Sequence, residues 1–94
     1  MSNSIAAIIL TKNEEKHIGR CIHSLEGVCD EIFVIDSFST DRTCEIAEAL
    51  GAKVYRNPWK NYATQFNYGV YQCPIQSEWI WRIDADEYLD GNIG

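Results

Sequence analysis

The sequence lacks a long hydrophobic run, since its longest unbroken aliphatic stretch is the six residues from Ile5 to Leu10. A membrane-spanning helix needs about 20 apolar residues, and a secretory signal needs a basic start and a longer apolar core than this one. Neither pattern is present, so we expect a cytoplasmic protein. Apolar residues nevertheless make up 46% of the 94 residues, which predicts one folded domain over residues 1–94.

Basic charge is also scarce. Eight Lys and Arg residues accompany 14 Asp and Glu residues, the formal net charge is −6, and the basic residues form no cluster. Proteins that bind nucleic acids normally present a basic face, so this composition excludes nucleic acid as a partner. Five acids and one base lie between Glu78 and Gly94. An acidic segment of this kind is either a solvated surface or a cation site.

Several motifs are missing. The chain contains no GxGxxG, no GxxxxGK[ST] and no GxSxG, which excludes a dinucleotide fingerprint, a P-loop and a hydrolase nucleophile elbow. Its four cysteines include no CxxC pair, which argues against a zinc ribbon. We interpret them as reduced thiols, with Cys21 and Cys44 buried as small hydrophobic side chains of helices. Because the chain contains no glycine-rich phosphate-binding motif, we expect a phosphate-bearing ligand to be held through a metal.

The sequence does contain apolar strand-like segments that alternate with amphipathic helical segments. The run at 5–10 is typical of a strand covered on both faces, and apolar residues recur at helical spacing from Ile18 to Leu25. This alternation predicts an α/β fold with three α-β-α layers and a mainly parallel sheet. We expect strands at 5–10, 31–36, 53–56 (near an edge) and 79–84, and helices from a cap at Asn13 to Gly27, from about 41 to 50 and from about 62 to 71.

Polar clusters follow three of the predicted strands, at 11–14, 36–37 and 84–86. Ligands of parallel α/β sheets bind beyond the carboxyl ends of the strands, so we expect these clusters to converge on one rim. Asp36 either caps the turn that follows it or accepts hydrogen bonds from a bound nucleotide. Thr11 and Glu14 likewise either start a helix or contact a nucleotide, and Asp41 is more consistent with a helix start than with a ligand.

The sharpest signal is the pair Asp84 and Asp86. Side chains two residues apart on an extended backbone point the same way, and two neighbouring carboxylates repel each other unless a cation lies between them. Oxygen-rich acidic pairs suit Mg²⁺ or Mn²⁺, which would bridge to the phosphate oxygens of a substrate. Two surface acids in a turn are the alternative interpretation, and the position after an apolar strand favours the metal site.

The motifs of the chain form a pattern that covers nearly its whole length in order and spacing. They are IILTKNEE at 8–15, DEIFVIDSFSTD at 30–41, GAKV at 51–54, Trp59, YATQFN at 62–67 and IDADE at 83–87. Together they resemble the nucleotide-binding half of inverting glycosyltransferases of family 2, which have the GT-A fold. The TKNEE segment at 11–15 and the YATQFN segment at 62–67 most resemble the subgroup that adds glucose to the inner core of lipopolysaccharide.

The resemblance implies a UDP-sugar donor and a role for each matching residue. Asp84 and Asp86 match the Asp-x-Asp motif, which holds Mg²⁺ or Mn²⁺ and the donor diphosphate. The implied acceptor is a glycolipid or saccharide of the cell envelope, and the implied parent protein associates peripherally with the inner face of the membrane. The residues that the resemblance assigns to the nucleotide are Thr11, Glu14, Asp36, Gln65, Asn67 and Asp84.

Two features depart from the family pattern. Phe38 stands where the family usually has glycine, so a turn that requires positive φ would leave this residue strained or the loop rebuilt. Family domains are also much longer, so we interpret the chain as a donor-binding half without the acceptor-binding half and its catalytic base. We expect no sugar transfer by this chain alone. Trp79, Trp81 and an open sheet edge would be exposed, which predicts self-association into a homo-oligomer.

Two other classes of function stay open at this point. A metal-dependent nucleotidyltransferase or phosphohydrolase could use the same acidic pair, and it would release phosphate from a nucleotide. A non-catalytic α/β module would carry these acids only as solvated surface groups. Its melting would respond to neither UDP nor Mn²⁺.

Overall fold

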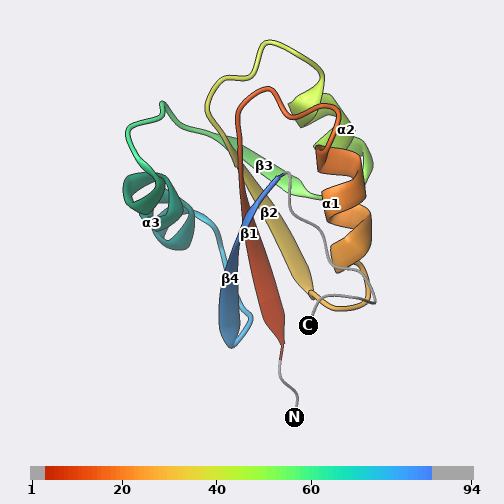
Figure 1. Cartoon of the computed structure of the whole chain (residues 1–94). Coiled ribbons are helices and arrows are strands. Elements are labelled where there is room, and N and C mark those ends of the chain that lie inside the picture. The colour runs from red at the N-terminus through yellow and green to blue at the C-terminus, as the bar shows by residue number, and fades with distance from the viewer. Residues whose placement is uncertain (1–3, 86–94) are drawn as a thin grey trace.

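The computed structural model describes residues 4–85 of the chain (Figure 1). Strands and helices alternate in the predicted order, and the strand positions agree with the prediction to within one residue. The elements are β1 (Ile5–Thr11), α1 (Ile18–Leu25), β2 (Glu31–Asp36), α2 (Thr43–Ala49), β3 (Lys53–Arg56), α3 (Tyr62–Gln72) and β4 (Trp79–Asp84).

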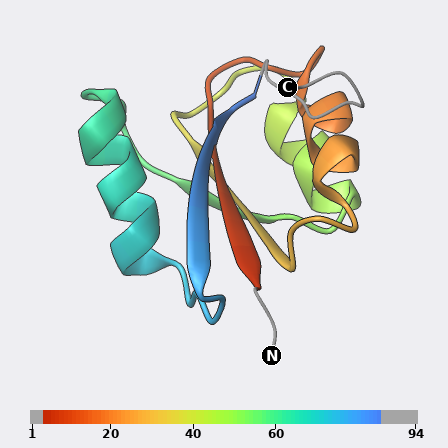
Figure 2. The same ribbon diagram turned by 60° about the horizontal axis from the view of Figure 1, so that its bottom comes forward.

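The four strands form one parallel sheet in the order β3-β2-β1-β4. Helices α1 and α2 cover one face and α3 covers the other, as Figures 1 and 2 show. The predicted three-layer α/β fold is therefore confirmed, and the short, polar β3 does lie at an edge. None of the helices within residues 4–85 has the length and apolar character that a membrane span requires.

β1 is continuously apolar because it lies inside the sheet and is covered on both faces. Ala7 and Ile9 belong to the hydrophobic cluster beneath α1 and α2, whereas Ala6, Ile8 and Leu10 belong to the cluster beneath α3. Alternate side chains of a strand point to opposite faces, so each face needs its own apolar set. The sequence pattern and the layer arrangement thus explain each other.

The predicted start of α1 is wrong. The helix begins at Ile18 rather than just after Asn13, and its N-terminal flanking residue makes no side-chain cap. Asn13 has a φ of 53°, in the left-handed region, so it cannot lead directly into a right-handed helix. A turn follows it, in which the backbone N–H groups of His17 and Ile18 donate to the carbonyl of Glu14.

Helix α3 lies very close to the sheet at Gly69. A Cβ atom at this position would approach side-chain carbons of Ile35 and Ile8 to 3.0 and 3.1 Å. Such distances are shorter than carbon–carbon contacts in well-packed cores, so only glycine fits without a shift of its neighbours. The residue that weakens the helical sequence pattern is therefore the one that lets α3 pack.

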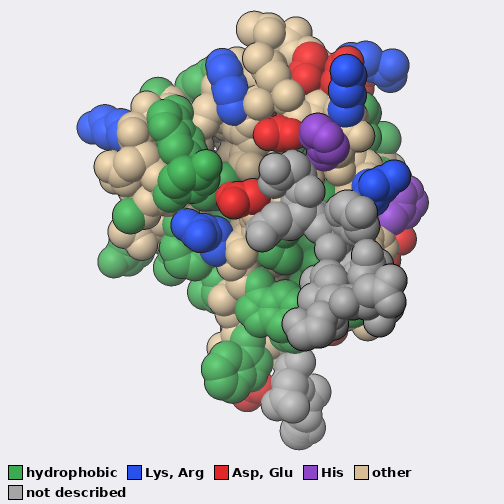
Figure 3. Space-filling model, viewed as in Figure 1, with side chains coloured by type: hydrophobic (Ala, Val, Ile, Leu, Met, Phe, Trp, Pro, Cys, Tyr) green, Lys and Arg blue, Asp and Glu red, His purple; other side chains and the backbone are tan. Residues whose placement is uncertain are grey.

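One surface is left partly uncovered along β4. Trp79 is 59% exposed and Trp81 is 38% exposed, and β4 is an edge strand of the sheet. Figure 3 shows hydrophobic side chains gathered over β4 and α3 on this side of the molecule. The exposure that was predicted for the two tryptophans is present in the described residues.

Candidate functional site

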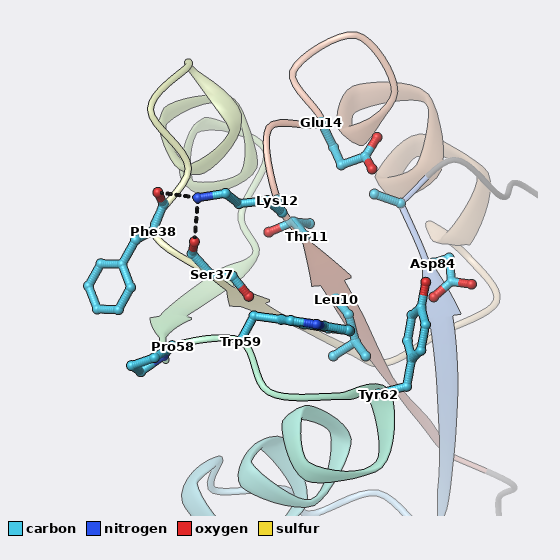
Figure 4. Close-up of a pocket in the computed structure, with 11 residues that line it drawn as sticks. Leu10, Thr11, Lys12, Glu14, Ser37, Phe38, Pro58, Trp59, Tyr62 and Asp84 are labelled. Carbon is cyan, nitrogen blue, oxygen red and sulfur yellow. Dashed lines mark hydrogen bonds between the residues drawn. The ribbon is translucent and has the colours of Figure 1, made fainter.

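A pocket with a volume of about 610 Å³ lies at the carboxyl ends of β1, β2 and β4 (Figure 4). Such a volume is within the usual range of ligand sites, and the position is the one that parallel α/β sheets favour for ligands. The start of α3 and the segment before it close the pocket from below in Figure 4. Its lining residues are Leu10, Thr11, Lys12, Glu14, Ser37, Phe38, Pro58, Trp59, Tyr62, Asp84 and Ala85.

The register of the sheet places Asp84 on the α3 face. Leu10 pairs with Ile35 on one side and with Asp84 on the other, so these three side chains form a row on one face. Asp84 is half-buried and lines the pocket. Its predicted metal-binding partner, Asp86, lies outside the described residues.

Asp36 lies in the next row, on the opposite face. It pairs with Thr11, whose hydroxyl donates to Asp36 Oδ1 at 2.6 Å. The hydroxyl of Ser39 donates to the same oxygen, and the Ser39 N–H donates to Oδ2 at 2.7 Å. Asp36 is fully buried and is absent from the pocket lining. Its carboxylate therefore joins the ends of β1 and β2 beneath the pocket.

The environment of Asp36 favours its charged form. Burial raises the pKa of this carboxyl, but the hydrogen bonds from Ser39 and Thr11 together outweigh burial and leave the pKa below its ordinary value. A buried charge is costly unless its oxygens are hydrogen-bonded, and here they are. The sequence interpretation in which Asp36 caps the following turn corresponds to these contacts.

Hydrogen bonds tie the loop after β1 to the loop after β2. The Asn13 N–H donates to the Ser39 hydroxyl, and the Asn13 side-chain oxygen accepts from the Thr40 N–H. Further along, the Glu14 N–H donates to the Thr43 hydroxyl at 2.8 Å. Asn13, which was predicted to cap a helix, thus connects the two loops instead.

Lys12 makes the corresponding connection at the pocket itself. Its Nζ donates to the backbone carbonyls of Ser37 and Phe38 at 3.0 and 3.1 Å (Figure 4). Phe38 has a φ of 57°, so the turn does require the left-handed conformation that glycine adopts most easily. The Phe38 side chain is 52% exposed at the pocket rim.

The two α3 residues assigned to the nucleotide have different surroundings. Gln65 is buried, and its side-chain amide donates to the Ser37 hydroxyl and to the Asn57 carbonyl. It therefore holds α3 against the end of β2. Asn67 is exposed and is not among the pocket-lining residues. Of the six residues assigned to the nucleotide, Thr11, Glu14 and Asp84 line the pocket.

Sequence reasoning gave no role to the aromatic residues at the start of α3. The rings of Trp59 and Tyr62 meet edge to face, with centroids 4.8 Å apart, and both line the pocket. The Arg82 guanidinium lies 5.5 Å from the centroid of the Tyr62 ring. A signal was present in the sequence, because Pro58 lies just beyond the end of β3 and cannot continue it, and two large aromatic side chains follow at the start of the next helix.

The cysteines are free thiols, as predicted. Burial, followed by the charge of Asp36, raises the pKa of Cys44 to about 11, and burial followed by Glu31 does the same for Cys73. Both thiols stay protonated at neutral pH, so neither is an activated nucleophile. Within residues 4–85, no three His, Cys, Asp or Glu side chains lie together as a protein-only metal site would require.

Comparison with known proteins identifies the family. The model of the family described as Glycosyl transferase family 2 matches residues 6–92. The chain belongs to glycosyltransferase family 2. The resemblance drawn from the sequence segments is thereby confirmed, and the parallel sheet with helices on both faces is that of GT-A glycosyltransferases.

Relatives of this family member include both uncharacterized and named enzymes. It is 46% identical over 93 residues to an uncharacterized glycosyltransferase of Rickettsia bellii, covering 99% of this chain and 31% of the relative. It is 38% identical over 91 residues to the lipopolysaccharide core biosynthesis glycosyltransferase LpsC of Rhizobium meliloti, covering 92% of this chain and 33% of that protein.

Among solved structures, the chain resembles glucosyl-3-phosphoglycerate synthase from Mycobacterium tuberculosis in complex with Mn²⁺, uridine-diphosphate-glucose and phosphoglyceric acid. The TM-score is 0.74 at 26% identity, and the match covers 89% of this chain and 33% of that one. The chain thus spans about a third of the length of these three proteins.

Proposed function

We propose that this chain is the part of a family 2 glycosyltransferase that binds a UDP-sugar together with Mg²⁺ or Mn²⁺. The observation that carries the proposal is the pocket at the carboxyl edge of the sheet, in which Asp84 lies opposite the connected loops after β1 and β2. Family membership supports sugar transfer over the alternative of a phosphohydrolase or nucleotidyltransferase. The synthase of similar fold, which binds Mn²⁺ and uridine-diphosphate-glucose, supports the choice of donor.

The described residues suit a hard divalent cation. Asp84 presents carboxylate oxygens to the pocket, and such cations prefer oxygen ligands and complete their coordination with phosphate oxygens. In the proposal Asp84 and Asp86 hold the cation. When bound, it would offset the negative charge of the UDP leaving group.

The opposite side of the pocket would bind the nucleoside. Thr11, Glu14 and Ser37 line it with polar groups, and Lys12 fixes the carbonyls of the β2 loop. In the proposal Asp36 and Gln65 act on the nucleotide indirectly. Asp36 accepts a hydrogen bond from Thr11, and Gln65 donates one to Ser37, so each holds a residue that lines the pocket. Asn67 would reach the donor only at the exposed edge of α3.

The wider setting is also a proposal. LpsC, named for lipopolysaccharide core biosynthesis, supports a parent enzyme that glycosylates a cell-envelope glycolipid or saccharide at the inner face of the membrane. The acceptor site and the catalytic base that deprotonates the acceptor would belong to sequence beyond this chain. The chain alone would therefore bind donor without transferring sugar, and the exposed Trp79 and Trp81 would promote self-association. A strictly monomeric species in sedimentation at high concentration would contradict the last point.

The decisive experiment is a titration of the chain with UDP, with and without the diamagnetic Mg²⁺, followed through backbone amide NMR shifts. We expect shifts at Thr11, Ser37 and Asp84 that are much larger with Mg²⁺ present. The Asp84→Asn variant should lose the Mg²⁺ dependence, whereas Glu48→Gln, which removes an exposed charge on α2, should keep it. Absence of shifts at the pocket residues of the unmodified chain would refute the proposed function.

A further inference from the structure

The pocket has two chemically different ends. Asp84 lies at one end, whereas Phe38 and Pro58 lie at the other, with Trp59 between them above Leu10 (Figure 4). One end therefore presents a carboxylate, and the other presents flat apolar surface. A ligand that satisfies both ends must join an anionic, cation-binding group to a flat uncharged one.

The Trp59 ring is held in place before any ligand arrives. The Tyr62 ring meets the Trp59 ring edge to face, at an interplanar angle of 88°. The Arg82 guanidinium in turn lies over the Tyr62 ring, 5.5 Å from its centroid. Asn61, which lies between Trp59 and Tyr62 in the sequence, caps α3: its side-chain oxygen accepts a hydrogen bond from the Thr64 N–H and so fixes the start of the helix. Trp59 nevertheless keeps 45% of its surface exposed, so part of the indole is open to a partner.

Phe38 is retained in an unfavourable backbone conformation. Its φ of 57° lies in the left-handed region, where a non-glycine residue is disfavoured, and its exposed ring recovers little by burial. Lys12 holds the Phe38 carbonyl and so enforces the conformation. Strain at a pocket rim with no packing benefit indicates that the side chain serves a ligand.

We propose that Phe38 and Trp59 form the stacking surface for the nucleobase of the donor. This inference rests on the proposed function, which places the diphosphate at Asp84. A nucleotide-sugar carries its base and its sugar on opposite sides of the diphosphate, and the base is its flat aromatic group. The aromatic end of the pocket, away from Asp84, therefore receives the base, and stacking on aromatic rings is a general mode of base binding.

The test compares two probes on the same 94-residue chain by titration calorimetry. UDP with Mn²⁺ reaches both ends of the pocket, whereas pyrophosphate with Mn²⁺ reaches only the Asp84 end. Trp59→Ala should weaken UDP binding at least about fivefold and leave pyrophosphate binding unchanged. Trp59→Phe, which keeps a ring, should restore most of the UDP affinity. Trp79→Ala removes a tryptophan that is even more exposed but lies outside the pocket lining, and it should change neither affinity.

A second pair of variants separates stacking from strain. Phe38→Gly and Phe38→Ala both remove the ring, but only glycine relieves the left-handed backbone. Both should weaken UDP binding and spare pyrophosphate binding. The thermal midpoint should rise for Phe38→Gly relative to Phe38→Ala, while both variants lose UDP affinity to the same extent, so that the loss follows the ring and not the backbone strain.

The outcomes distinguish the two proposals. Failure of UDP to bind the unmodified chain in the presence of Mn²⁺ would refute the proposed function itself. If UDP binds the unmodified chain, and Trp59→Ala and Phe38→Gly bind it equally well, the stacking assignment is overturned while the proposed function stands. Equal losses for UDP and pyrophosphate would also overturn it, because the two side chains would then act only by shaping the pocket.

Discussion

The two sides of the pocket are built in different ways. The loops after β1 and β2 are connected by hydrogen bonds from Asn13 and Lys12 and by the buried carboxylate of Asp36. The β4 side instead presents the half-exposed Asp84 on an edge strand, with Trp79 and Trp81 exposed along the same strand. The Asp36 carboxylate is hydrogen-bonded by Thr11 and Ser39 away from the pocket lining, whereas Asp84 lines the pocket.

The difference shows how two aspartates at the ends of β2 and β4, the strands on either side of β1, acquire separate functions. Asp36 has its oxygens occupied by Thr11 and Ser39, so it contributes to folding. Asp84 faces a cavity, so a ligand can gain from its charge. We therefore expect changes on the β1/β2 side to alter mainly stability, and changes on the β4 side to alter mainly ligand binding.

The largest expected effect is that of Asp36→Asn. The new amide group places donors where Thr11 and Ser39 already donate, so buried hydrogen bonds to a charged group are lost. We expect the free energy of unfolding to fall by about 3 kcal/mol, measured by urea denaturation. Asp84→Asn is the matched control and should cost less than about 1 kcal/mol because its side chain is only half-buried. Equal losses for the two variants would break the comparison.

Ligand binding should show the reverse preference. UDP with Mn²⁺ at about 100 times the dissociation constant should stabilise the unmodified chain by about 2.7 kcal/mol through mass action. Asp84→Asn should remove most of this gain at the same concentrations, and Glu48→Gln should retain it. A thermal shift assay measures both. A full gain in the Asp84→Asn variant would exclude Asp84 from the donor site.

Acid should destabilise the chain through Asp36. The folded-state pKa of Asp36 lies below its ordinary value of 3.8, so its contribution is present above that pH and is lost as the pH falls through the folded-state pKa. Each pKa unit of lowering corresponds to about 1.4 kcal/mol. Urea denaturation between neutral pH and acid should show a steeper loss for the unmodified chain than for Asp36→Asn. Parallel curves would show that the ionisation of Asp36 does not stabilise the fold.

The smallest effect concerns Lys12. Lys12→Met removes two hydrogen bonds to carbonyls of the β2 loop while keeping the aliphatic stem, so we expect a loss of about 1 kcal/mol in unfolding free energy. Lys16→Met removes an exposed lysine of the same loop and should change stability by less than about 0.5 kcal/mol. Amide hydrogen exchange at Ser39 and Thr40 should accelerate only in Lys12→Met. Equal exchange rates in both variants would show that Lys12 does not hold the loops together.

Much of the fold was predictable because local patterns and layers agree. The observed layers follow from the apolar run of β1 and the apolar stripe from Ile18 to Leu25. The edge position of β3 follows from its short, polar sequence. The start of α1 was not predictable in the same way. A capping residue followed by two acids favours a helix locally, but Asn13 instead bonds to Ser39 and Thr40 across the fold.

The candidate site was predictable in part for the same reason. Thr11, Glu14 and Asp84 come at strand ends, which a parallel sheet brings to one edge, and they do line one pocket. The contribution of Trp59 and Tyr62 to the pocket was not predicted, because a Trp and a Tyr at the start of a helix are equally consistent with core packing. Their assignment needed the exposure of Trp59 and its contact with Tyr62.

The sequence by itself determined the alternation of strands and helices, the family and the polar character of three strand ends. Only the tertiary structure decided which carboxylate opens into the pocket. Leu10 pairs with Asp84 and Thr11 pairs with Asp36, so the two acids point to opposite faces of the sheet. A strand's side chains alternate with a period of two, and a register shift of one residue would exchange these faces. That register depends on pairing between segments far apart in the chain, which no local pattern of residues encodes.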